Sequence, residues 1–123
     1  MPKPEDLMGN GMPGELANVL GVAPLKITCA GTTQGTATAI PLVTGIELVP
    51  TTNQTGAILN TNSLVGTKYY CFNAAATAVT AKVYCPVGET MNGTLNGSVS
   101  IAQNQGCIVE QYKNNYWMSV LTA

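Results

Sequence analysis

The sequence predicts an all-β domain, an antiparallel β-sandwich or small barrel (a jelly roll is one option), preceded by a short helical N-terminal arm. Two features of the 123 residues indicate this organisation. From residue 27 onward, short runs rich in Thr, Val and Ile are interrupted by Gly, Asn and Pro about every ten residues, which is typical of strands joined by turns. Residues 1–26 hold five of the eleven charged residues, whereas residues 27–107 hold only four. We therefore assign residues 1–26 to the arm and residues 27–123 to the β domain.

The arm is predicted to form two short helices with one apolar side. Pro4 suits the first turn of a helix, and Pro13 begins a second helix that ends at Leu20. Helices this short are not stable alone in water, so the arm must dock its apolar side chains on a surface. That surface belongs either to its own β domain or to a partner. The apolar contacts of the arm are Leu7, Met8, Met12, Leu16, Val19 and Leu20.

Seven strands are predicted in the β domain from the alternation of apolar and polar side chains, which suits antiparallel strands with one buried face. The Asn-Gly dipeptides that begin at Asn92 and Asn96 predict turns with positive φ, and residues 113–115 predict the tip of a final hairpin. The predicted strands are Thr36–Ile40, Gly45–Val49, Lys68–Asn73, Val79–Cys85, Gly97–Ile101, Cys107–Tyr112 and Tyr116–Leu121.

The composition argues against several classes of function. Only 9% of the residues are charged, against about 25% in an average soluble protein, and the chain has neither His nor Arg. Without a basic stripe we expect no nucleic-acid binding, and without a basic patch or an apolar run of about 18 residues we expect no membrane association. The usual acid–base and nucleophilic catalysts are missing as well, so we expect no enzymatic activity, no cofactor and no metal.

Three acidic residues and one glycine-rich motif remain as candidates for chemistry. Glu47, Glu89 and Glu110 are the only acids in the β domain, and a glycosidase site would require two of them to converge. Residues 9–14 match the GxGxxG pattern of nucleotide-binding loops, but no strand is predicted before them and Pro13 removes an amide. A hinge between two helical turns is the favoured interpretation of these glycines.

The four cysteines are predicted to be buried free thiols. Cys29, Cys71, Cys85 and Cys107 form no CxxC pair, which argues against a zinc site. The first ten residues do not resemble an export signal, so we favour thiols that pack as small apolar groups over two disulfides.

Tyr84, Tyr116 and Trp117 are predicted to anchor either the core or a subunit interface, as large aromatic residues commonly do. The alternative is a sugar-stacking platform to which the other tyrosines contribute. The outward residues of the strands are mainly Thr, Asn, Gln and Ser, which repel other copies weakly. We therefore expect a protein that packs against neighbours.

Four groups of short motifs follow one another along the chain in a characteristic order. They are Asp6-Leu7-Met8-Gly9 with Gly11-Met12-Pro13, Leu16-Ala17 and Leu20-Gly21; Gly31-Thr32-Thr33-Gln34 with Thr36-Ala37-Thr38-Ala39-Ile40; Val83-Tyr84-Cys85-Pro86 with Gly88 and Asn92-Gly93; and Val99-Ser100-Ile101 with Tyr116-Trp117. Together they resemble the small β-rich head decoration (cement) or head-fibre proteins of tailed bacteriophages. The chain departs from similar sequences at Gly35, where Ala is usual, near Phe72-Asn73, where Arg or Asn-Arg is common, and at Cys85, since similar chains have no Cys before the proline.

The resemblance implies a structural role without catalytic residues. It implies a homo-oligomer, often a trimer, that is made in the bacterial cytoplasm and is seated on the outer capsid surface of the virion against the major capsid protein. We expect the arm to grip the capsid and the β domain to form the oligomer. The alternative function is a head fibre, or a glycan- or receptor-binding β module on the virion.

Overall fold

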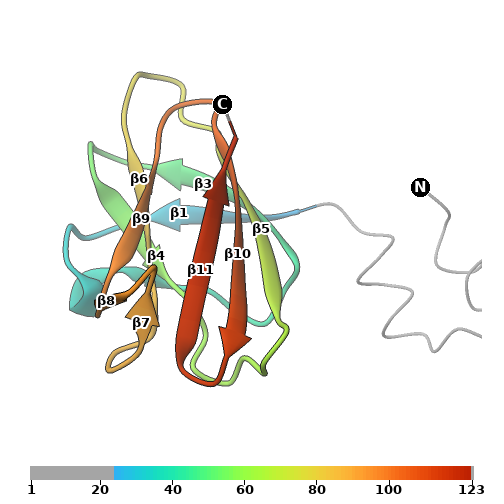
Figure 1. Cartoon of the computed structure of the whole chain (residues 1–123). Helices are drawn as coiled ribbons and strands as arrows, with labels where there is room; N and C mark the ends of the chain where they lie inside the picture. The colour runs from blue at the N-terminus through green and yellow to red at the C-terminus, as the bar shows by residue number, and fades with distance from the viewer. Residues whose placement is uncertain (1–23, 123) are drawn as a thin grey trace, which may run out of the picture.

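The computed structural model describes residues 24–122, which fold into strands with a single short 3₁₀ turn (Figure 1). The predicted all-β class is confirmed. The helical arm, with Leu7, Met8, Met12, Leu16, Val19 and Leu20, lies outside the described residues. The elements are β1 (Leu25–Cys29), η1 (Gln34–Thr36), β2 (Thr38–Ala39), β3 (Gly45–Pro50), β4 (Thr55–Ile58), β5 (Lys68–Asn73), β6 (Ala81–Tyr84), β7 (Thr90–Met91), β8 (Thr94–Leu95), β9 (Ser98–Ile101), β10 (Gly106–Lys113) and β11 (Tyr116–Leu121).

The strands form two sheets, and the first six strands alternate between them. The larger sheet has the order β1-β3-β5-β10-β11-β7-β8, and the smaller has the order β2-β4-β6-β9. Because each turn of the chain adds one strand to each sheet, β1, β3 and β5 run parallel, as do β2, β4 and β6. This half of the domain is therefore wound like a short β-solenoid, and the prediction of antiparallel strands is wrong for it. Alternating side chains indicate that one face of a strand is buried, but they do not indicate the direction of its neighbour.

The second half of the domain closes the two sheets mainly with antiparallel strands, and the exception is β7, which runs parallel to β11. β9 pairs with β6, and β10 pairs with both β5 and β11. The predicted final hairpin is present, with Asn115 at positive φ between β10 and β11. The predicted turn at Asn92-Gly93 is also confirmed, because both residues have positive φ and they join β7 to β8.

One buried cluster takes side chains from both sheets and forms the core. Ile46, Leu48 and Tyr69 enter it from the larger sheet, and Val83 and Ile101 enter it from the smaller. Buried Asn73 ties the two sheets together, because its amide nitrogen donates to the carbonyl of Ile101 at 2.8 Å. A buried amide satisfied in this way fixes the relative position of the sheets as well as stabilising them.

Candidate functional site

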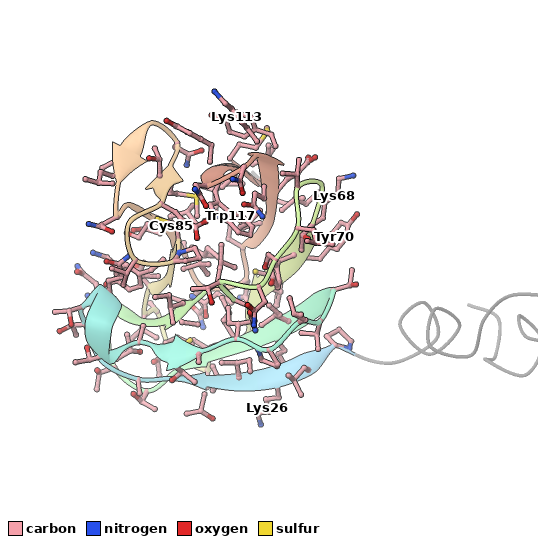
Figure 2. The ribbon with its side chains drawn as sticks, turned by 90° about the horizontal axis from the view of Figure 1, so that it is seen from below. Lys26, Lys68, Tyr70, Cys85, Lys113 and Trp117 are labelled. Carbon is pink, nitrogen blue, oxygen red and sulfur yellow. The ribbon has the colours of Figure 1, made fainter. Side chains whose placement is uncertain are left out.

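Trp117 is a core residue. Its side chain is 1% exposed and packs against the ring of Tyr69, with the ring centroids 6.0 Å apart. Its indole nitrogen donates a hydrogen bond of 2.8 Å to the carboxylate of Glu89. In Figure 2, Trp117 lies within the outline of the domain, whereas Lys26, Lys68 and Lys113 lie at its edge. Trp117 is therefore not available to stack on a sugar.

Tyr84 and Tyr116, the other two predicted anchors, lie in different environments. Tyr84 is buried in the smaller sheet, where its hydroxyl donates to the carbonyl of Thr32 at 3.0 Å. Its ring covers Gly56, where an added Cβ would lie 2.7 Å from the ring, so only glycine fits below it. Tyr116 is 40% exposed, and its ring centroid lies 6.4 Å from that of Tyr112. The three residues do not converge on one site.

The three acidic candidates for glycosidase chemistry do not converge either. Glu89 is engaged by the Trp117 indole. Glu47 and Glu110 lie on the same side of the larger sheet but are separated by β5, opposite Phe72 and Lys68 respectively. Standard strand spacings place their backbones about 16 Å apart. A carboxylate pair that acts across a sugar requires about 5–10 Å, so these positions do not form such a pair.

All four cysteines are buried and free, as predicted. Cys71 and Cys107 face each other across β5 and β10. Burial raises the pKa of the Cys71 thiol to about 12, with a further contribution from the neighbouring Cys107 and Cys29. Burial also raises the pKa of Cys29 and of Cys107 to about 11. These thiols are protonated at neutral pH and have the character of apolar core groups, not of nucleophiles.

The protein is expected to lose stability as the pH rises above 9. The three raised pKa values mean that the unfolded chain releases its thiol protons from about pH 9, whereas the folded chain holds them to about pH 11 or 12. Below pH 9 both states keep the proton, so the full stability is present there. Each thiol is expected to lower the free energy of unfolding by about 1 kcal/mol by pH 10.

Urea denaturation at pH 8 and at pH 10 measures this loss of stability, and Cys71→Ala should show a smaller loss than the parent protein. Equal losses in the two proteins would contradict a raised pKa of the Cys71 thiol in the folded protein.

An open hollow lies at the end of the domain where β5 begins. It has a volume of about 350 Å³, and its lining includes Leu42, Val43, Leu64 and Tyr69. Lys68 is the only charged residue in the lining. The hollow therefore offers apolar contact and holds no acid–base pair.

The larger exposed feature is an apolar area on the outside of the larger sheet. We use the name outer face for seven side chains on β5, β10 and β11: Tyr70, Phe72, Ile108, Tyr112, Tyr116, Met118 and Val120. Sequence reasoning placed Tyr116 among the predicted anchors and considered Tyr70 and Tyr112 only for the sugar-stacking alternative. The missed signal is that β5 carries aromatic residues at both alternations, with Tyr69 inward and Tyr70 outward. A strand that is apolar on both sides needs a cover on both sides.

The described part of the chain shows neither a metal-binding group nor a spanning helix. Residues 24–122 contain no cluster of three or more metal-ligating side chains, and none of their helical segments could cross a membrane. Comparison with known proteins finds no family model that matches the chain and no curated protein with significant sequence similarity. The chain's own residues are therefore the basis for assigning a function.

Proposed function

We propose that this protein is a capsid decoration protein that binds the outside of a bacteriophage head as a homo-oligomer and stabilises its lattice. The observation that carries the proposal is the outer face, an exposed apolar area on a domain with very few charges. An exposed apolar area of this size is unfavourable in water and indicates a surface that another protein molecule covers. The ordered motifs that resemble head decoration proteins support the same role.

The proposed mechanism is multivalent binding. A trimer presents three copies of each capsid contact, so that moderate individual contacts with the major capsid protein add up to firm attachment. Because the oligomer binds assembled subunits and not free ones, it shifts the equilibrium toward the intact shell. In this proposal residues 1–26 grip the capsid, and the β domain forms the oligomer and the outer knob. The single core shared by the two sheets supports a compact, sandwich-like knob.

A head fibre or glycan-binding module is the second candidate. It is favoured by the exposed rings of Tyr70, Tyr112 and Tyr116, which lie on neighbouring strands. A sugar ring can stack on such side chains, and hydrogen-bonding groups beside them are then needed for specificity. A glycan array probed with the full chain distinguishes this candidate, since a decoration protein is expected to bind none of the sugars.

Cosedimentation with phage heads tests the proposed function. Heads assembled without the chain should bind the purified full-length protein until a fixed number of copies per head is reached. Heads that already carry their complement should bind no more, which controls for adhesion to protein surfaces in general. Failure to bind the heads assembled without the chain, or binding that does not saturate, would contradict the proposal.

A further inference from the structure

The side chains of the outer face form continuous rows across three strands. Tyr70, Ile108 and Val120 are cross-strand partners and make one row over β5, β10 and β11. The adjacent row contains Met118 beside Glu110. Tyr112 and Tyr116 extend the area at the hairpin end, and Phe72 extends it on β5. Because direct cross-strand neighbours are about 5 Å apart, these side chains form one patch.

The patch is confined to β5, β10 and β11. Exposure of its seven side chains runs from 40% for Tyr116 and Met118 to 56% for Val120. On the same side of the sheet, β1 and β3 present Lys26, Thr28 and Glu47, and Val49 is the one apolar side chain there. An ordinary solvent-facing sheet would continue that polar pattern onto β5, β10 and β11. The change at β5 therefore marks the boundary of the apolar patch.

The size of the patch fits a protein interface. Seven large side chains exposed at this level present on the order of 500–600 Å² of surface. A standard interface buries about 800 Å² per partner, including a polar rim. The patch is therefore the right size for the apolar centre of an interface, and Lys68 and Glu110 lie at its polar positions.

The charge of the patch favours a second copy of the chain as the occupant. Lys68 and Glu110 are direct cross-strand partners (Figure 2 shows Lys68 and Tyr70 on the same side of the molecule). Lys113 lies over the ring of Tyr116, 5.0 Å from its centroid, and Glu47 is the cross-strand neighbour of Phe72, so the positive and negative groups at the area balance. A balanced, apolar surface attracts neither nucleic acid nor an anionic membrane. A copy of the same surface offers the matching area, with no net repulsion between the two.

We propose that the outer face packs against a second copy of the chain and is the contact that builds the homo-oligomer. This deepens the proposed function, on whose oligomer it rests, but it does not require that the chain bind a shell. Two identical faces packed directly on each other would close as a dimer, so in a trimer the outer face of each copy lies toward the threefold axis and contacts both neighbours. In that arrangement Tyr70, Ile108 and Val120 become buried at the centre of the contact.

Sedimentation velocity of the full chain, without any shell, tests the contact. The parent protein is expected to sediment as an oligomer at micromolar concentration. Tyr70→Lys and Val120→Lys should each sediment as monomers, because each places an unpaired charge in the apolar centre. Thr28→Lys is the matched control, since it adds the same charge on the same side of the sheet at β1, and it should keep the parent mass. The blue-shifted emission of buried Trp117 verifies that each variant is folded.

A conservative variant covers the case in which the lysine variants fail to fold. Val120→Thr keeps the β-branched shape and strand propensity, and it should weaken association about tenfold. A monomeric parent protein, lysine variants that keep the parent mass, or Val120→Thr with parent affinity would overturn the contact. So would a monomeric parent that binds a glycan through Tyr70. Because no shell is present, this result is independent of whether the protein decorates heads.

Discussion

Trp117→Ala is expected to lower the free energy of unfolding by about 3–5 kcal/mol. The substitution empties the largest fully buried side-chain volume in the described residues and removes the packing against Tyr69. It also removes the donor that satisfies the Glu89 carboxylate. A partly buried carboxylate without its partner adds a desolvation cost to the cavity. Urea denaturation followed by circular dichroism measures the change, because the variant has no tryptophan left to report on unfolding.

Tyr116→Ala is the matched control for this prediction. Tyr116 is the preceding residue on the same strand, but its side chain points outward and is 40% exposed. Its removal from the monomer is expected to cost under about 1 kcal/mol. Trp117→Phe should lie between the two, because it keeps a ring in the core but loses the indole N–H. Equal costs for Trp117→Ala and Tyr116→Ala would contradict the role of Trp117 as a core anchor.

Deletion of residues 1–24 is expected to abolish binding to phage heads while leaving the β domain folded and oligomeric. The core and the outer face are built from residues beyond the deletion, so neither loses a side chain. The removed segment carries the apolar residues assigned to the capsid contact. Because attachment is multivalent, the loss of one contact per copy removes it from every subunit at once. Cosedimentation with heads that lack the protein measures the effect.

A full-length variant controls for the altered chain length. Leu16→Asp with Leu20→Asp keeps all residues but places charges on the predicted apolar side of the arm. It should bind heads as weakly as the truncated protein. Saturation of the heads by the truncated protein would show that the β domain, and not the arm, holds the capsid.

The sequence was sufficient to locate most strands of the β domain but not their directions. The seven predicted strands overlap β2, β3, β5, β6, β9, β10 and β11, because each shows alternation between turn residues. β4 was missed because Gly56 interrupts a short strand, and β1 because Leu25–Cys29 crosses the change in charge composition near residue 26. The solenoid-like winding depends on which sheet each strand joins, and local patterns do not record that choice.

The functional surface was only partly predictable for a similar reason. The aromatic residues were identified as anchors, but sequence alone did not separate the buried Trp117 and Tyr84 from the exposed Tyr116. The alternation of side chains along a strand assigns them to the core or to the outside only after one residue is known to face the core. The outer face became visible once Tyr69 was placed inward, which put Tyr70 outside beside Ile108.

A cryo-electron microscopy map of the intact phage head tests the central claim most directly. We predict density for the β domain on the outer surface of the shell, at positions where several capsid subunits meet, with neighbouring copies in contact through β5, β10 and β11. Purified heads that contain the protein but show no such density outside the shell would contradict the account.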